Sequence, residues 1–221
     1  MLCARCASAS GRASPWSSSV SSSKQHWEAI YASKSDAELS WTQPDPALSL
    51  SLIGEVCPAG GSVIDIGGGS SGLAARLRDG GYSVTVLEIS EAALQRARQQ
   101  IGPRAEHVRW ITADVTKCPN LGRFDVWHDR AVFHFLTDAA GRASYVDLLS
   151  RTIPPGGHAV IATFALDGPE KCSGLPVCRY DGRSLAEELG PGFRLLKTVA
   201  ERHRTPWGAP QSFQYSVFAQ S

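Results

Sequence analysis

The sequence has no large excess of charge and no long apolar run. Both absences reduce the number of function classes to consider. Its 22 Lys and Arg residues nearly balance its 21 Asp and Glu residues, for a net charge of +1. This balance gives no electrostatic reason to expect nucleic acid or a membrane surface as a partner. No apolar run approaches the roughly 20 residues of a transmembrane helix, so no span is expected. A chain of 221 residues is long enough for one domain with a sizeable core.

Residues 1–23 lack aspartate and glutamate but contain many serines. This composition is typical of a disordered tail, which cannot bury enough apolar surface to fold. It is equally typical of an organelle transit peptide. Secretion is not expected, because the apolar core of a secretory signal is missing. Localisation is therefore expected to be cytoplasmic or organellar, in a mitochondrion or plastid. Cys3 and Cys6 have C-x-x-C spacing without a second ligand pair nearby, so no metal site is expected.

From residue 24 onward, predicted strands and helices alternate. Strands are predicted within 60–69, 82–90, 107–115, 124–136, 158–165, 193–204 and 212–220, and helices within 45–56, 71–81, 91–102, 142–157 and 181–190. This order predicts an α/β fold with a parallel sheet covered on both faces. The last two strands have no helix between them, which indicates an antiparallel end to the sheet. Ligands of such sheets bind beyond the carboxyl ends of the strands.

Three consecutive glycines, Gly67, Gly68 and Gly69, lie where the first strand turns into a helix. Glycine adopts positive φ easily and lets a ligand approach the backbone closely. The N–H groups at the start of the helix can hold a carboxylate or a phosphate. The stretch therefore indicates a nucleotide-type ligand, with a tight turn that binds nothing as the alternative.

Three acidic residues refine the choice of ligand. Glu88 ends the second strand, about 20 residues after the glycines, where a carboxylate can accept hydrogen bonds from ribose hydroxyls. That spacing admits NAD as well as other adenosine ligands. Asp65, inside the first strand, favours a ligand with an ammonium or sulfonium group. Asp114, after the third strand, is placed to accept from an adenine amino group. The alternatives are a solvated loop acid for Glu88 and a helix cap or turn residue for Asp114.

Five motifs in this order, "VIDIGGG", "VTVLEIS", "ITADVT", "FDVWHDR" and "IPPGGHAVIATF", resemble those of class I S-adenosylmethionine-dependent methyltransferases. The resemblance covers residues 24–221. It implies a Rossmann-like three-layer sandwich with a seven-stranded, mostly parallel sheet whose last strand is antiparallel. It also implies S-adenosyl-L-methionine as cofactor. The chain departs from the family pattern at Ser71, where a third glycine is often found.

The resemblance also implies residue roles. Asp65, Gly67 and Gly69 would line the methionine end of the cofactor, and Glu88 would hold its ribose. Asp114 and Val115 would hold the adenine. The full set of expected cofactor-binding residues is Tyr31, Trp41, Asp65, Gly67, Gly68, Gly69, Glu88, Ile89, Asp114, Val115 and His128, the last through its backbone.

Within that family, residues 26–46 and "HDRAVFHFL" are similar to small methyltransferases of the thiopurine and halide/thiol type. The similarity implies that a segment at about 24–50 folds over the cofactor as a lid. The lid candidates are Trp27, Tyr31, Trp41 and Gln43. Trp27 would also contact the acceptor. The alternative is that Trp27 and Trp41 simply pack in the interior.

The stretch after the fourth strand lies at the expected active-site edge. Asp129 and His134 are candidate general bases there, because a base is needed when the acceptor must lose a proton. Each has a structural alternative: Asp129 in an ion pair or at a helix terminus, and His134 as a packed histidine. Phe133 and Phe135 are candidate walls of a water-poor acceptor pocket, or else part of the core.

A loop after the fifth strand supplies Cys172, Cys178 and Arg179 as candidate acceptor contacts, with a purely structural loop as the alternative. Trp207 and His203 are weaker candidates. The expected function is methyl transfer to a small-molecule acceptor. The alternatives are a protein (lysine) methyltransferase and a non-catalytic S-adenosylmethionine-binding protein. The oligomeric state is left open.

Overall fold

The computed structural model describes residues 20–221, with side chains from Ser23 onward. Residues 1–19, including Cys3 and Cys6, lie outside the described part. The expected tail or transit peptide therefore falls mostly outside it, although the first helix begins at Val20, inside the segment assigned to the tail.

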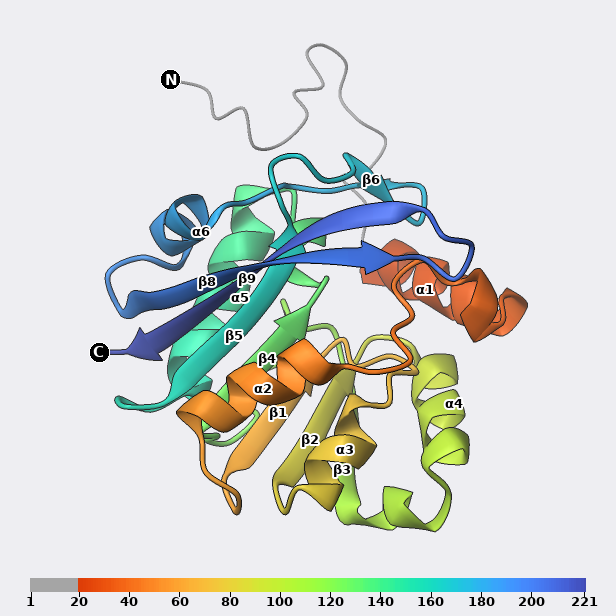
Figure 1. Cartoon of the computed structure of the whole chain (residues 1–221), viewed down its shortest axis with the longest axis horizontal. Coiled ribbons are helices and arrows are strands. Elements are labelled where there is room, and N and C mark those ends of the chain that lie inside the picture. Colours follow the sequence, from red (N-terminus) through yellow and green to blue (C-terminus); the bar gives the residue numbers. More distant parts are fainter. Residues whose placement is uncertain (1–19) are drawn as a thin grey trace.

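A seven-stranded sheet forms the centre of the molecule, in the order β3-β2-β1-β4-β5-β9-β8 (Figure 1). Its strands are β1 (Ser62–Ile66), β2 (Ser83–Glu88), β3 (Val108–Thr112), β4 (Val126–Arg130), β5 (His158–Phe164), β8 (Phe193–Arg204) and β9 (Pro210–Gln220). The first five are parallel, and β9 runs antiparallel to both of its neighbours. The predicted α/β fold and its antiparallel last strand are confirmed.

Helices cover both faces of the sheet, because successive strand residues point to opposite faces. Val63 of β1 packs in one core cluster and Ile64 in the other. The first cluster contains residues of α2 (Ala47–Val56), α3 (Leu73–Asp79) and α4 (Glu91–Ile101), and the second contains residues of α5 (Ala139–Thr152) and α6 (Gly182–Leu189). In Figure 1, α2 and α3 lie in front of the sheet and α5 lies behind it.

The N-terminal helix α1 (Val20–Ser33) packs against α4 at one side of the molecule. Its Glu28 carboxylate accepts hydrogen bonds from Ser90 Oγ, Glu91 N and Ala92 N, at 2.8–3.1 Å. Glu28 therefore satisfies free N–H groups at the start of α4 from another helix. Burial raises the pKa of Glu28, but these hydrogen bonds outweigh it and leave the pKa below its ordinary value.

Several short elements complete the described fold. They are the 3-10 helices η1 (Asp36–Glu38), η2 (Gly102–His107) and η3 (Phe133–Phe135), and a separate hairpin of β6 (Lys171–Cys172) and β7 (Leu175–Pro176). The hairpin was not predicted, because two-residue strands leave no periodic pattern. Across residues 20–221, no helix combines the length and apolarity that crossing a membrane requires.

Candidate active site

The glycine loop after β1 requires glycine at each of its three positions. Gly67 and Gly69 have φ of +64° and +54°, values that favour glycine. A Cβ at Gly67 would lie 2.1 Å from Val132 Cγ2, and one at Gly69 would lie 2.5 Å from the Tyr31 hydroxyl. At Gly68 it would lie 2.7 Å from Asp65 Oδ2. The chain therefore passes here between neighbours that leave no room for a side chain.

Glu88 lies at the end of β2, directly beside this loop. Its carboxylate accepts hydrogen bonds from Gly69 N at 3.1 Å and from Ser90 N at 3.0 Å. Burial raises the pKa of Glu88 to about 7, against the lowering effect of these N–H groups. A ligand that donates hydrogen bonds to this carboxylate would favour its ionised form.

Asp114 follows β3 and forms a turn. Its Oδ1 accepts hydrogen bonds from Thr116 N at 2.9 Å and from Thr116 Oγ1 at 2.7 Å, while Oδ2 lies 3.8 Å from Lys117 Nζ. The expected alternative of a turn residue is thus present, and Asp114 also lines the main cavity. Its second oxygen accepts no hydrogen bond that the structure records.

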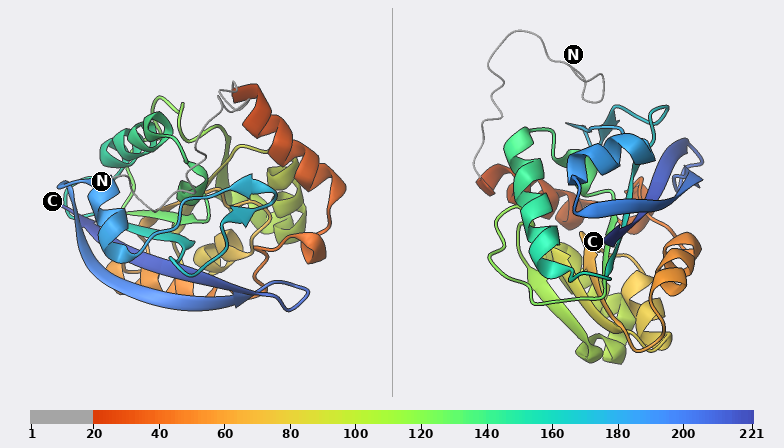
Figure 2. Two further views of the ribbon diagram at one scale, coloured as in Figure 1. Left: turned by 90° about the horizontal axis from the view of Figure 1, so that it is seen from above. Right: turned by 90° about the vertical axis from the view of Figure 1, so that its left-hand side faces the viewer.

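A cavity of about 470 Å³ lies at the carboxyl ends of β1, β2, β3 and β4. Its position is the one that a doubly wound sheet favours for ligands. Seen from above, α1 and α5 stand on opposite sides of the molecule (Figure 2), and both contribute walls to the cavity. The expected site residues that line it are Trp27, Tyr31, Trp41, Gly67, Glu88, Ile89, Asp114, Val115, Phe135 and Cys172.

Aromatic rings form a large part of the wall. The Trp27 ring meets those of Trp41 and Phe135 edge-on, with centroids 5.7 and 5.1 Å apart, and Trp41 meets Tyr31 at 6.1 Å. Tyr31 is buried, and burial raises its pKa far above the ordinary value. These residues pack together and also face the cavity, so the two alternatives for Trp27 and Trp41 are compatible.

The β6–β7 hairpin and α1 both contribute walls to the cavity. Cys172 and Leu175 of the hairpin line the cavity, as does Ser23 of α1. Cys172 is buried, which raises the pKa of its thiol to about 11, so the thiol is protonated near neutral pH.

Arg130, at the end of β4, is a cavity residue that the sequence reasoning did not single out. Its Nε donates to Tyr215 Oη at 3.1 Å and its Nη1 to the Trp41 carbonyl at 2.9 Å. Its Nη2 is buried, lies 3.8 Å from Glu201 Oε2, and has no hydrogen-bond partner among the described residues. A buried guanidinium nitrogen without an acceptor fits an anionic ligand group.

A smaller cavity of about 70 Å³ adjoins the first and shares Tyr31, Trp41, Ile66, Gly67 and Arg130 as walls. It also contains the remaining expected cofactor residues, Gly68, Gly69, Asp65 and His128, together with the lid candidate Gln43.

Asp65 and His128 are paired across neighbouring strands. Asp65 Oδ1 lies 2.7 Å from His128 Nδ1, and His128 Nε2 lies 2.9 Å from Ser49 Oγ. All three residues are buried. His128 was expected to contribute its backbone, whereas the structure shows that its side chain holds Asp65.

Asp129, an expected general base, is not among the residues that line the two cavities. Its carboxylate accepts hydrogen bonds from Val132 N at 2.8 Å, Phe133 N at 3.0 Å and the Tyr145 hydroxyl at 2.6 Å. It is completely buried, and burial raises its pKa to about 6. Asp129 therefore fixes the turn between β4 and η3, as its structural alternative supposed.

His134, the other expected general base, is also buried in the interior. Its ring packs on Phe135 and Phe164, with centroids 4.6 and 4.7 Å apart, and Nδ1 accepts from Phe164 N at 3.3 Å. Burial, and to a lesser degree Arg130, lowers its pKa to about 3. It is therefore a neutral, packed histidine near pH 7 that lies behind the cavity residue Phe135.

Three expected acceptor contacts are also absent from the cavity walls. Phe133 is buried against Tyr145 and Tyr180, on the α5 side of the sheet. Cys178 is buried, and its N–H donates to the His134 carbonyl at 2.8 Å. Arg179 donates to Glu170 Oε1 at 3.1 Å and to the Gly168 carbonyl at 3.2 Å. These contacts agree with the structural alternative for each residue.

The weaker candidates lie at the margins. His203 Nε2 lies 2.7 Å from the Ser40 carbonyl, and Trp207 is 60% exposed. Cavity residues that sequence reasoning missed include Lys117, Asp138 and Ser144. Asp138 caps α5 by accepting from Gly141 N, so its only sequence signal was that of a helix start.

Comparison with known proteins agrees with this geometry. A family model described as a methyltransferase domain matches residues 63–157, which run from β1 to the turn before β5. The malonyl-[acyl-carrier protein] O-methyltransferase of Enterobacter lignolyticus is 34% identical over 130 residues, covering 57% of this chain and 45% of that protein. This chain spans about half, or less, of the length of the curated relatives that it matches.

Two solved structures extend the similarity to nearly the whole chain. One was reported for the conversion of a disulfide bond into a thioacetal group during echinomycin biosynthesis. It has a TM-score of 0.71 and 19% identity, covering 90% of this chain and 92% of the other. The other is the 1,6-didemethyltoxoflavin-N1-methyltransferase of Burkholderia thailandensis. It has a TM-score of 0.63 and 19% identity, covering 91% and 85%.

The sheet order and layers are those of the Rossmann-like fold found in solved S-adenosylmethionine-dependent methyltransferases. Residues 63–157, which include the glycine loop, Glu88 and Asp114, are the part of the chain that matches the methyltransferase-domain model.

Proposed function

We propose that the chain is an S-adenosylmethionine-dependent methyltransferase with a small-molecule acceptor. The main support is that one cavity brings together Gly67, Glu88 and Asp114 at the strand ends with an aromatic wall that includes Trp27 and Phe135. The first group suits an adenosyl ligand, and the second suits an apolar or flat guest.

The residues present fit this cofactor at each of its polar groups. Glu88 would accept from the ribose hydroxyls, and Asp114 with Val115 would bind the adenine. Asp65 would face the ammonium group and Arg130 the carboxylate of the methionine end. The buried Arg130 Nη2 lies 3.8 Å from Glu201 Oε2 and has no hydrogen-bond partner among residues 20–221, which favours an anion there.

When bound, S-adenosylmethionine supplies an electrophilic methyl group. The task of the chain is then to hold the acceptor in line with that group and to exclude water. Orientation of this kind can contribute roughly 7–11 kcal/mol to lowering the barrier. Trp27, Phe135 and Leu175 supply apolar surface for that task.

A lid role for the segment at about 24–50 is part of this proposal. Several hydrogen bonds fix the segment to the body: Arg96 Nη2 donates to the Tyr31 and Lys34 carbonyls, and Ser70 Oγ donates to Asp36. Trp27, Tyr31 and Trp41 of this segment cover the cavity. Such a cover leaves space for a small acceptor, and the similarity to a toxoflavin-type methyltransferase fold is consistent with that choice.

Two measurements test the proposal. Isothermal titration calorimetry should show binding of S-adenosylmethionine and S-adenosylhomocysteine, and an absence of binding to either would refute it. Incubation of the full chain with tritiated donor and cell extract, followed by separation by size, should place the label in the small-molecule fraction. Label confined to protein would instead support a protein methyltransferase.

A further inference from the structure

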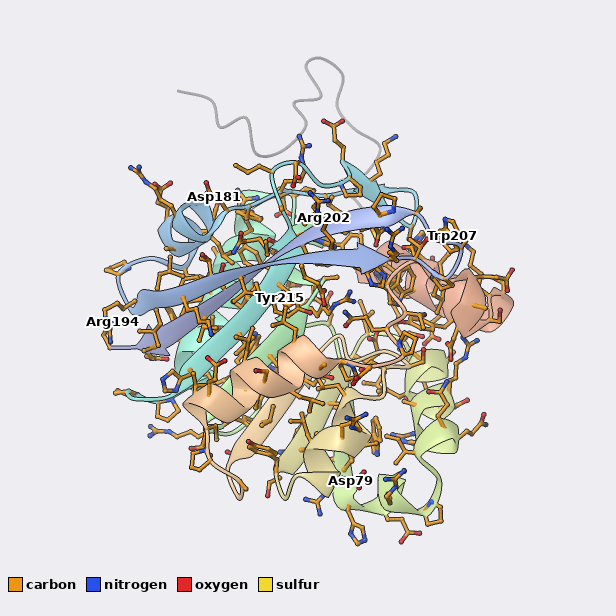
Figure 3. All side chains as sticks on the ribbon, viewed as in Figure 1. Asp79, Asp181, Arg194, Arg202, Trp207 and Tyr215 are labelled. Atoms are coloured by element: carbon orange, nitrogen blue, oxygen red, sulfur yellow. The ribbon has the colours of Figure 1, made fainter. Side chains whose placement is uncertain are left out.

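A network of hydrogen bonds in two separate parts holds Arg130 and Asp65, through three uncharged side chains. In the first part, Arg130 Nε donates to Tyr215 Oη at 3.1 Å. In the second part, Ser49 Oγ lies 2.9 Å from His128 Nε2, and His128 Nδ1 lies 2.7 Å from Asp65 Oδ1. Figure 3 labels Tyr215 on β9 near the middle of the molecule, above α2, which supplies Ser49.

The two ends of this network carry opposite charges, which determines the direction of its hydrogen bonds. A carboxylate only accepts, so His128 Nδ1 must donate to Asp65. With a neutral imidazole, Nε2 then accepts from the Ser49 hydroxyl, while the Tyr215 hydroxyl accepts from Arg130. Ser49 and His128 thus hold the Asp65 carboxylate, and Tyr215 holds the Arg130 guanidinium.

Both charged ends also face the smaller cavity, beside the glycine loop. Each end keeps an atom outside the network: Asp65 Oδ2 points toward Gly68, and Arg130 Nη2 has no hydrogen-bond partner in the described part of the chain. A carboxylate oxygen and a guanidinium nitrogen beside one small space match a zwitterion.

We propose that Ser49, His128 and Tyr215 are positioning residues that hold Asp65 and Arg130 as a matched pair of charges for the zwitterionic amino-acid end of the cofactor. This inference rests on the proposed function. The three residues act through the charged pair and do not take part in methyl transfer. Their loss should therefore affect only ligands that carry the amino-acid group.

The test compares two adenosyl thioethers by calorimetry on the full chain. S-adenosylhomocysteine has the zwitterion, and 5′-deoxy-5′-methylthioadenosine lacks it. The wild-type protein should bind the first at least about tenfold more tightly. In Ser49→Ala and Tyr215→Phe, affinity for S-adenosylhomocysteine should fall roughly 5- to 20-fold, because each removes one link. Affinity for methylthioadenosine should stay within about twofold.

Matched variants separate positioning from a general structural role. Ser49→Thr keeps a hydroxyl and should retain most of the wild-type affinity. Tyr82→Phe removes a hydroxyl that bonds to the Cys57 carbonyl, away from both cavities, and should change neither affinity. Thermal melts identify any variant that fails to fold. If Tyr215→Phe fails to fold, the comparison of Ser49→Ala with Ser49→Thr still distinguishes a positioning role from a general structural role.

Three results would overturn the inference: equal affinity of the wild type for the two ligands, equal losses for both in the variants, or no loss at all. Failure of the wild type to bind either ligand would refute the proposed function itself. The two failures are therefore distinguishable in one set of titrations.

Discussion

At the scale of single residues, Gly67 and Glu88 show that the carboxyl edge of the sheet leaves little room for other side chains. Gly67 combines a left-handed φ with a direct obstruction by Val132. Glu88 is a buried carboxylate held only by backbone N–H groups. Both positions therefore have consequences that can be measured separately.

Gly67→Ala should lower the free energy of unfolding by about 1–3 kcal/mol, because the new methyl group would contact Val132 at an unfavourable φ. Urea unfolding measures the change. The double variant Gly67→Ala/Val132→Ala should regain the stability lost through contact with Val132. It should not regain the stability lost through the unfavourable φ. An unchanged midpoint for Gly67→Ala alone would show that the loop can move aside.

Affinity for S-adenosylhomocysteine should rise by up to about tenfold between pH 6 and pH 8. The pKa of Glu88 is raised to about 7 by burial in the free protein. Ribose hydroxyls favour the ionised carboxylate and lower its pKa in the complex, so binding releases a proton and strengthens as pH rises through 7. Calorimetry at the two pH values measures this, and Glu88→Gln should abolish the dependence. A flat profile in the wild type would contradict it.

At the scale of elements, Glu28 joins two helices that are far apart in the sequence. It lies on α1 and accepts three hydrogen bonds from Ser90, Glu91 and Ala92, at the start of α4. The cover of the cavity is thereby attached to the helix that follows Glu88.

Glu28→Ala should destabilise the protein by roughly 1–2 kcal/mol, the usual cost of losing a helix cap. Hydrogen exchange should accelerate in α1 and in the first turn of α4. The exposed Glu187, paired with Arg183, provides a matched carboxylate control whose change to alanine should alter stability by less than about 0.5 kcal/mol. Equal effects of the two substitutions would argue against coupling through Glu28.

The elements were also the part of the structure best predicted from the sequence. Strong periodic segments such as 82–90 and 91–102 correspond to β2 and α4. The glycine loop, Glu88 and Asp114 could be found because their positions follow from strand ends. For Asp129 and His134 the sequence left two alternatives open, because a strand end does not show whether the next side chains turn inward to bond a loop. Arg130 was missed because a single arginine has no pattern until Trp41 and Tyr215 surround it.

At the scale of the whole molecule, the cavity is assembled from segments that are spread along the chain between Ser23 and Leu175. Its floor comes from the ends of β1, β2 and β3, and its cover from α1 and the β6–β7 hairpin. Occupation of the cavity should therefore stabilise segments that are distant in sequence.

S-adenosylhomocysteine at about 100 times its Kd should raise Tm by roughly 5–10 °C, which corresponds to about 2.7 kcal/mol of linkage. Differential scanning fluorimetry at one fixed ligand concentration gives the shift. Trp27→Ala should reduce it, because Trp27 covers the cavity, whereas Trp207→Ala should preserve it. Trp207 lies at the tip of the β8–β9 hairpin and is 60% exposed (Figure 3). Identical shifts in the two variants would contradict a covering role for α1.

Because the floor and the cover of the cavity come from different elements, substitutions in the two parts should have different effects. The strand ends proposed to hold the methyl donor belong to the central sheet, while much of the surface left for the acceptor belongs to α1 and to the β6–β7 hairpin, whose strands have two residues each. Substitutions at Trp27, Cys172 or Leu175 should therefore change the specificity for the acceptor more than they change the affinity for the methyl donor.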